Sequence, residues 1–372
     1  MKLIVAILLL LQPYLLFSQT HYYLIAGTYT KGKSKGIYVY DFNSGDGSSV
    51  IVDSIITSNP SYLTVSPDQK FVYAVSEVVR GNNSGQVRAF AFDKKTGHLR
   101  FINEQASMGD NPCYIAINKK GNWVVVGNYS SGTLASLPVH KDGSLGAPAS
   151  SVTHRGKGPN AARQEAPQVH STVFSPDNKN VFVPDLGIDQ VKVYTLNPTT
   201  GSLRVAKDSA VKLAPGSGPR HFEFDPNKRW AYLIQELSGT ITAFDYSNGR
   251  LRSFQMISTL PAGFNQPFTS ADIHVSKDGR FLYASNRDSS NTLAIFRIDQ
   301  KIGKLSLVGH QSTLGKTPRN FNLDPSGNFL LVANQNSDDI VVFRIDHERG
   351  LLTDTGKRIG IGNPVCIKWA DK

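Results

Sequence analysis

The sequence predicts an all-β protein: a seven-bladed β-propeller of four-stranded antiparallel blades, closed by strands from both termini. Three observations predict this fold. Short apolar runs alternate with Gly, Asn, Asp and Pro residues, which is typical of short strands joined by turns. A turn motif recurs roughly every 50 residues, which is a repeat length typical of propeller blades. The two ends of the chain carry complementary parts of one further repeat.

Residues 218–251 show the repeat most clearly. We expect residues 221–224 to form a first strand, 230–236 a second and 240–246 a third. A hairpin turn at 247–249 then leads to a fourth strand. Antiparallel neighbours bring the start of the first strand and the end of the second to the same edge of the blade.

Six copies of this unit follow one pattern: a turn, an apolar second strand, a third strand and a Gly turn before the fourth. The turns lie at residues 66–68, 118–120, 175–177, 225–227, 276–278 and 324–326. The second strands are expected at 71–75, 123–126, 181–183, 230–234, 281–284 and 329–333. Third strands are expected, among others, at 86–92, 190–196, 292–298 and 339–345.

The ends of the chain supply the seventh blade. Residues 22–57 contain a second, third and fourth strand with no first strand before them, and residues 363–369 read as a first strand with nothing after it. Joined, they close the ring and leave it without a free end. An open solenoid would not explain this complementarity. We therefore expect one domain over residues 20–372, without a substantial helix.

Residues 1–19 differ from the rest of the chain. Lys2 precedes an apolar run that Gln12 and Pro13 interrupt, and Ser18 follows it. This pattern is typical of a secretory signal peptide and is too short for a membrane span. We expect an exported protein, periplasmic or secreted, with no membrane span after signal removal. The two cysteines, Cys113 and Cys366, have no metal-binding spacing and are expected as unpaired, partly buried thiols.

The net charge of +11 is spread along the chain without a long basic run. A nucleic-acid-binding protein would need a clustered basic stripe with interleaved aromatic residues, so we expect no nucleic-acid partner. A solvated basic surface accounts for most of the charge. A basic pocket for an anionic small molecule is the more specific interpretation.

Three columns of the aligned repeats carry most of the unusual polar residues. Two lie at the entrance of the innermost strand and one at the end of the second strand, so they should form a ring at one mouth of the central channel. We expect one further column in the same ring. It stands one residue before the column at the end of the second strand and consists of Ser76, Asn128, Asp185, Gln235, Asn286 and Asn334. The main candidates are Glu77, His170, Arg220, His221, Glu236, Asp272, Arg287, Arg319, Asn320 and Gln335.

The ring chemistry favours hydrolysis without a covalent serine intermediate. The sequence has no Gly-x-Ser-x-Gly elbow, no phosphate-binding Walker loop and no His-Glu-x-x-His motif. A carboxylate or imidazole base beside arginines fits water attack on an anionic ester, or proton transfer next to a carboxylate.

Several segments resemble a known family. Residues 163–194, 218–226, 273–287 and 317–335 are similar to the seven-bladed lactonase family, which includes the propeller-type 6-phosphogluconolactonases and, more distantly, the fungal carboxymuconate cyclases. The resemblance implies an active site at the channel mouth. It carries over to His170, Arg220, Glu236 and Arg287, with Arg163 on an insertion overhanging the same mouth. One departure is Gln168, which stands where many relatives have a histidine.

The leading hypothesis is a lactone hydrolase that acts on a sugar-derived or anionic lactone without a metal or other cofactor. Glu236 or His170 would activate water, while Arg220 and Arg287 would hold the developing oxyanion and an acid group of the substrate. His221, Asp272, Arg319, Asn320, Gln335, Glu77 and Arg163 would bind the substrate.

Three alternatives remain open at this point. The ring could be structural polar filling, with Arg287 and Glu236 as one ion pair. The protein could be a non-catalytic exported propeller that binds a carbohydrate or a protein partner through the same mouth. A channel Ca²⁺ could assist catalysis, because Glu77, Asp272, Asn286 and Asn334 offer oxygen ligands of the type that it prefers.

Overall fold

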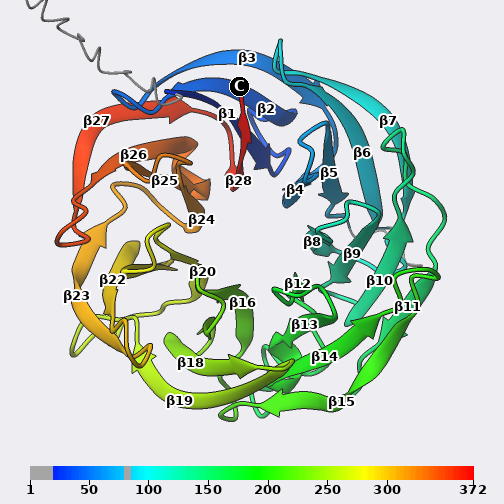
Figure 1. Cartoon of the computed structure of the whole chain (residues 1–372). Helices are drawn as coiled ribbons and strands as arrows, with labels where there is room; N and C mark the ends of the chain where they lie inside the picture. The colour runs from blue at the N-terminus through cyan, green and yellow to red at the C-terminus, as the bar shows by residue number, and fades with distance from the viewer. Residues whose placement is uncertain (1–19, 79–84) are drawn as a thin grey trace, which may run out of the picture.

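The structure, a computed structural model, describes residues 20–78 and 85–372. Within these ranges, strands β1 to β28 form seven four-stranded sheets that are arranged as a ring (Figure 1). The helical segments in the same ranges are two single 3₁₀ turns, η1 (Leu186–Ile188) and η2 (Gln335–Ser337). The prediction of a seven-bladed, all-β propeller without a substantial helix is confirmed.

All sheets are antiparallel meanders with the same order. The innermost strands are β4 (Leu63–Val65), β8 (Pro112–Ile117), β12 (Val173–Phe174), β16 (Pro219–Phe224), β20 (Ser270–Val275), β24 (Pro318–Leu323) and β28 (Pro364–Asp371). The second strands are β5 (Phe71–Ser76), β9 (Trp123–Asn128), β13 (Asn180–Asp185), β17 (Trp230–Gln235), β21 (Phe281–Asn286), β25 (Phe329–Asn334) and β1 (His21–Thr28).

The outer half of each blade consists of a longer hairpin. The third strands are β6 (Gln86–Asp93), β10 (Thr133–Pro138), β14 (Gln190–Leu196), β18 (Thr240–Ser247), β22 (Thr292–Ile298), β26 (Asp339–Ile345) and β2 (Gly36–Asn43). The fourth strands are β7 (His98–Ala106), β11 (Ser150–Thr153), β15 (Leu203–Lys212), β19 (Arg250–Ser258), β23 (Leu305–Ser312), β27 (Leu352–Gly360) and β3 (Ser48–Ile56).

The seventh blade is closed by both ends of the chain, as predicted. Strand β28 pairs antiparallel with β1, and the register places Leu24 opposite Trp369 and Ala26 opposite Ile367. Figure 1 shows the red C-terminal strand lying against the blue N-terminal strands. Backbone hydrogen bonds thus replace a free edge at the point where the ring closes.

The second strands are buried on both faces, because each blade packs between two neighbours. Val72, Tyr73, Ala74 and Val75 of β5 are all fully buried, for example. A strand buried on both faces needs apolar residues at every position rather than at alternate ones. This explains why the second strands are the most continuous apolar runs of the sequence.

The recurring Gly turns pack against the preceding blade. Gly143, with φ of 82°, lies so close to Phe71 that an added Cβ atom would be 2.1 Å from its ring, and the Tyr73 hydroxyl donates to the Gly143 carbonyl at 3.1 Å. Gly303 packs against Trp230 in the same way. The glycines therefore recur because the turn needs a positive φ and because an aromatic ring occupies the space of a side chain.

The last residue of each second strand is polar but lies away from the channel. Asn128 donates through Nδ2 to the carbonyl of Ser107 at 2.8 Å, and Asn286 donates to the carbonyl of Thr259 at 2.8 Å. These amides are fully buried and connect the second strand to the end of a fourth strand. The prediction that this column belongs to the ring at the mouth is therefore wrong, because strand alternation turns it outward.

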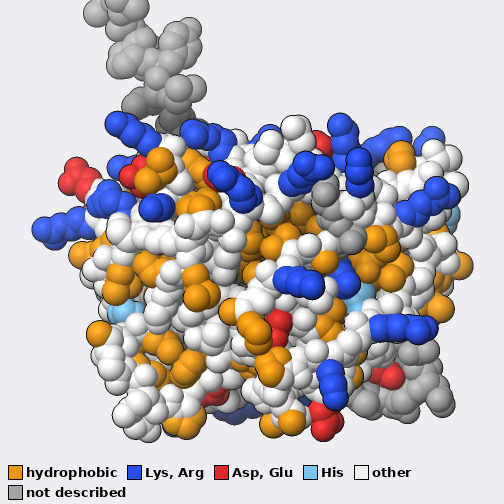
Figure 2. All heavy atoms as spheres, turned by 90° about the horizontal axis from the view of Figure 1, so that it is seen from below, with side chains coloured by type: hydrophobic (Ala, Val, Ile, Leu, Met, Phe, Trp, Pro, Cys, Tyr) orange, Lys and Arg blue, Asp and Glu red, His pale blue; other side chains and the backbone are white. Residues whose placement is uncertain are grey.

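The surface carries the positive charge as many separate side chains. Figure 2 shows Lys and Arg side chains along the upper edge of one side of the disc, interleaved with polar and apolar surface. None of the helices in the described residues is long and apolar enough to cross a membrane. The predicted signal peptide lies outside the described residues. Cys113 and Cys366 are free, as predicted, but buried rather than partly buried.

Candidate active site

The residue after each second strand occupies the same position at one end of the channel. Its N–H donates to a backbone carbonyl in the segment that leads into the innermost strand, as from Glu236 to Gly218 at 2.7 Å and from Arg287 to Thr269 at 2.8 Å. The repeated hydrogen bond brings all members of this column to one level. The members are Tyr29, Glu77, Tyr129, Leu186, Glu236, Arg287 and Gln335.

The entrance residues of the innermost strands lie beside this column because of bulges. The pairing of β16 with β17 shifts register between Pro219 and His221, and that of β24 with β25 shifts between Pro318 and Asn320. A bulge breaks the alternation of side chains and re-aims the extra residue. Arg220 and Arg319 are these extra residues, which accounts for their approach to the mouth.

The centre of the site is the buried carboxylate of Glu236. Its Oε2 accepts from Arg220 Nε at 2.9 Å and forms an ion pair with Arg287 Nη2 at 3.0 Å, while its Oε1 accepts from Arg163 Nη2 at 2.5 Å. His170 Nε2 lies 3.9 Å from Glu236 Oε2. The structure thus brings five of the predicted site residues into one cluster around a single carboxylate.

The arginines keep this carboxylate charged. Burial alone would raise the pKa of Glu236, but Arg287, Arg220 and Arg163 lower that pKa to about 2. Burial, reinforced by the nearby charge of Arg220, holds the pKa of His170 well below its usual value. At neutral pH the cluster therefore combines a carboxylate anion with an uncharged imidazole.

Arg163 reaches this cluster from the segment between β11 and β12. The neighbouring Gln164 is fully buried and donates through Nε2 to the Leu186 carbonyl at 2.7 Å and to Asp189 Oδ1 at 2.8 Å. These two hydrogen bonds fix the loop that precedes β12. From this loop Arg163 contacts Glu236 at the channel mouth.

A cavity of about 250 Å³ opens beside the cluster, and we call it the inner lobe. His170, Glu236, Arg287, Arg319 and Arg163 line it, together with Tyr29, Glu77, Asn111, Cys113 and Tyr129. The guanidinium of Arg319 lies over the Tyr29 ring, 5.4 Å from its centroid, and makes no hydrogen bond to any residue that the structure describes. Arg319 therefore keeps its donors available for a ligand.

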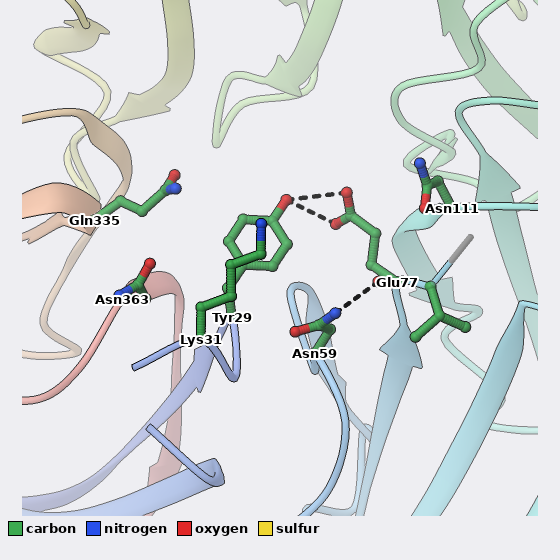
Figure 3. A pocket seen from close by; sticks show the side chains of 8 residues that line it. Tyr29, Lys31, Asn59, Glu77, Asn111, Gln335 and Asn363 are labelled. Atoms are coloured by element: carbon green, nitrogen blue, oxygen red, sulfur yellow. Dashed lines mark hydrogen bonds between the residues drawn. The ribbon is translucent and has the colours of Figure 1, made fainter. Parts of the chain in front are cut away.

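A second cavity of about 580 Å³ adjoins the first, and we call it the outer lobe (Figure 3). The two lobes share Tyr29, Glu77 and Asn111. The Tyr29 hydroxyl lies 2.9 Å from both carboxylate oxygens of Glu77, to which it donates. The predicted residue Gln335 lines the outer lobe only.

Four predicted residues lie behind the inner lobe rather than on it. Arg220 is 1% exposed, donates through Nη1 to the Ala271 carbonyl at 2.5 Å, and lies 3.2 Å from His221 Nε2. His221 Nδ1 lies 2.6 Å from Asp272 Oδ1, and Asn320 donates to the other oxygen of Asp272. Arg220, His221, Asp272 and Asn320 thus form a buried hydrogen-bonded layer beneath Glu236.

This buried layer has its own electrostatics. Burial and then Arg220 lower the pKa of His221 to about 4, so its ring donates from Nδ1 to Asp272 and accepts at Nε2 from Arg220. Sequence reasoning missed His274, which contacts Asp272 Oδ2 at 3.2 Å and Glu223 Oε2 at 2.6 Å. Glu223 and Asp272 overcome the effect of burial and raise the pKa of His274 to about 10.

Sequence reasoning also missed Tyr29 and Asn111 as cavity-lining residues, and it did not select Cys113 and Tyr129, which stand in the columns expected at the mouth. Tyr29 is the seventh member of the column that includes Glu236, and its N–H donates to the Asn363 carbonyl at 3.0 Å. The N-terminal fragment has no turn before its second strand, so an alignment of the repeats on their turns omits Tyr29. An alignment on the ends of the second strands includes Tyr29.

The four oxygen ligands proposed for Ca²⁺ do not come together. Asn286 and Asn334 are fully buried and bond to the carbonyls of Thr259 and Thr313. Among the described residues, no group of three or more His, Cys, Asp or Glu side chains is arranged to hold a metal ion. The geometry therefore does not support the calcium alternative.

Sequence comparison matches this architecture to known proteins. The model of the family described as lactonase, seven-bladed β-propeller, matches residues 23–369. A 6-phosphogluconolactonase of Bacillus subtilis is 35% identical over 354 residues, which is 94% of this chain and 99% of the relative. A 6-phosphogluconolactonase of Formosa agariphila is 40% identical over 335 residues, 88% of this chain and 94% of the relative.

Two solved structures superpose closely on this fold. A putative 6-phosphogluconolactonase of Bacteroides fragilis has a TM-score of 0.91 and 40% identity, covering 95% of this chain and 98% of its own. A periplasmic gluconolactonase of Pseudomonas aeruginosa has a TM-score of 0.89 and 39% identity, covering 94% and 99%. The resemblance found in the sequence is thereby confirmed, and the chain belongs to the seven-bladed β-propeller lactonase family.

Proposed function

We propose that the chain is a lactone hydrolase that opens a sugar-derived or anionic lactone in the inner lobe. The observation that carries this proposal is the Glu236 carboxylate, held by three arginines, beside the uncharged imidazole of His170. In the reaction, water adds to the ester carbonyl carbon and the ring C–O bond breaks. The product is an open-chain hydroxy acid, which releases a proton at neutral pH.

His170 is our candidate base for the attacking water, because three arginines already contact the Glu236 carboxylate. With a pKa of about 2, Glu236 is a weak base, although its charge is permanent near neutrality. His170 would take the proton from water and become an imidazolium. Glu236, whose Oε2 lies 3.9 Å from Nε2, would stabilise that cation. His170 would then return the proton to the departing ring oxygen.

Arg319 is the first candidate for the developing oxyanion. It lines the inner lobe, and its guanidinium makes no hydrogen bond within the described residues. Arg287 lines the same lobe, and its buried Nε has no hydrogen-bond partner among the described residues. Preorganised cations at the position of a developing oxyanion stabilise it more strongly than water does.

Arg220 takes a positioning role in this proposal rather than contact with substrate. It is buried beneath Glu236, to which it donates through Nε at 2.9 Å. Its other contacts, to the Ala271 carbonyl and His221, fix the guanidinium in place. Arg220 therefore orients the carboxylate, and the oxyanion role passes to Arg319 and Arg287.

We place this activity outside the cytoplasm. The pattern of residues 1–19 is typical of a secretory signal peptide. The relative from Pseudomonas aeruginosa, 39% identical, is described as a periplasmic gluconolactonase. An exported enzyme meets lactones made in the periplasm or outside the cell.

The test is a pH-stat assay of the mature chain with glucono-δ-lactone and with 6-phosphogluconolactone. We expect acid release above the spontaneous rate with at least one of them, and a 10²- to 10³-fold lower kcat for Arg319→Gln. Arg88→Gln, at an exposed surface ion pair with Glu104, is the matched control and should keep the parental kcat. No acid release above the blank from any lactone of a broader panel would reject the proposal.

A further inference from the structure

The outer lobe adds more space to the site than one small lactone needs. Pockets for drug-sized ligands have volumes of roughly 300–1,000 Å³. The inner lobe, at about 250 Å³, lies just below that range and suits a single small ring, whereas the adjoining outer lobe has about 580 Å³. A substrate that fills both lobes is therefore longer than a monosaccharide lactone.

The chemistry of the outer lobe differs from that of the inner lobe. Three arginines line the inner lobe, but the cation on the outer lobe is the exposed side chain of Lys31. The carboxylate of Glu77 lies on the same lobe, so the two charges oppose each other. A phosphate group prefers the bidentate fork of arginine. The outer lobe therefore suits an uncharged group better than a phosphate.

Side-chain amides dominate the lining of the outer lobe. Asn59, Asn111, Gln335 and Asn363 contribute four of them (Figure 3). The Nδ2 groups of three already donate within the protein: Asn59 to the Glu77 carbonyl, Asn111 to Ser130 and Asn363 to Asp338. An amide donates and accepts at the same time, which is what a sugar hydroxyl requires. The amide of Gln335 makes no side-chain hydrogen bond to any residue that the structure describes, so both of its ends are available. Tyr29 and Glu77 add a hydroxyl and an acceptor at the boundary of the lobes.

We propose that the outer lobe is a subsite for a neutral glycosyl group, and that the preferred substrates are lactones of disaccharide or longer aldonic acids. This inference rests on the proposed lactone hydrolysis in the inner lobe. The lactone ring occupies the inner lobe beside His170 and Arg319. The attached sugar extends past the Tyr29–Glu77 pair and hydrogen-bonds to the amide of Gln335.

The experiment compares kcat/KM for four lactones in the pH-stat, using the mature chain. These are glucono-δ-lactone, 6-phosphogluconolactone and the δ-lactones of cellobionic acid (1,4-linked) and melibionic acid (1,6-linked). We expect at least one disaccharide lactone to exceed glucono-δ-lactone by about tenfold, which corresponds to one or two additional hydrogen bonds. Gln335→Ala should reduce this ratio by about threefold to tenfold. A ratio of one or below in the parent would overturn the inference.

Lys31→Gln separates a sugar from a phosphate, because it removes the charge and keeps hydrogen-bonding groups. Phosphate binding in the outer lobe would lower kcat/KM for 6-phosphogluconolactone about tenfold in this variant and would overturn the inference. Affinity of the parent for the products provides a readout without turnover. By calorimetry, cellobionate or melibionate should bind about tenfold more tightly than gluconate. If no lactone is hydrolysed, the proposed function fails, and the product affinities alone decide about the subsite.

Discussion

Replacement of Glu236 by glutamine tests the electrostatics of the arginine cluster through stability. The change keeps the shape of the side chain and removes its charge. In the folded protein the pKa of Glu236 falls from 4.5 to about 2, and Glu236 is 4% exposed, so solvent screening is weak. A shift of this size corresponds to about 3 kcal/mol of folding free energy. Glu236→Gln should lose that contribution at pH 7.

The pH dependence of this loss has a definite sign. A carboxylate whose folded pKa is lowered stabilises the fold above its unfolded pKa, and this stabilisation disappears as the pH falls towards the folded pKa. The difference in unfolding free energy between parent and Glu236→Gln should therefore be about 3 kcal/mol at pH 6 to 7. It should shrink between about pH 4.5 and pH 2, where the parent becomes protonated and resembles the variant.

Urea unfolding of both proteins at several pH values between 7 and 3 measures this difference. The matched control is Glu104→Gln, because Glu104 forms an ion pair with Arg88 at 2.9 Å but is 39% exposed. Exposed pairs contribute at most about 1 kcal/mol, so the control should lose little. A loss for Glu236→Gln that equals the control, or that does not change with pH, would refute the electrostatic reasoning.

Three further predictions follow from single features. Because the pKa of His170 is lowered well below its usual value, kcat/KM should be flat from about pH 6 to 8 and should fall only in more acidic buffer; an inflection near pH 6.5 or above would contradict this. Gly303→Ala should lower Tm more than Gly263→Ala. Both glycines have positive φ, but only at Gly303 would an added Cβ atom meet an aromatic ring, that of Trp230, at 2.5 Å. Equal Tm values for the two variants would contradict the packing argument. The thiols of Cys113 and Cys366 are buried, and burial raises the pKa of Cys366 to about 11. Ellman's reagent should therefore react slowly with both thiols until urea unfolds the protein. Rapid reaction of the native protein would contradict this prediction.

The repeat made most of the fold predictable. The spacing of the turns, the continuous apolar second strands and the complementary ends determine blade number and closure, because each is a direct consequence of packing blades in a ring. The same alignment placed Glu236, Arg287 and Gln335 in one column at the mouth. A single repeated backbone hydrogen bond maintains that column, so sequence offset was enough to find it.

The side-chain directions were less predictable. Arg220 lies beneath Glu236, whereas Arg319, at the equivalent bulge of β24, lines the inner lobe. The two residues share type and repeat position, so the sequence does not distinguish them. Asn128 and its equivalents turn away from the channel to bond with the outer strands. The contact of Arg163 with Glu236 depends on the path of a loop, which Gln164 fixes by hydrogen bonds far along the chain.

The central claim is that His170 and Glu236 together open a lactone in the inner lobe. The most direct measurement is the kcat of parent, His170→Asn and Glu236→Gln on the best lactone substrate, by pH-stat, at a temperature where all are folded. His98→Asn, on the exposed start of β7, is the matched control. We predict that both site variants lose about 10²- to 10⁴-fold in kcat and that the control stays within twofold of the parent. Parental activity in a folded His170→Asn or Glu236→Gln variant would contradict the account.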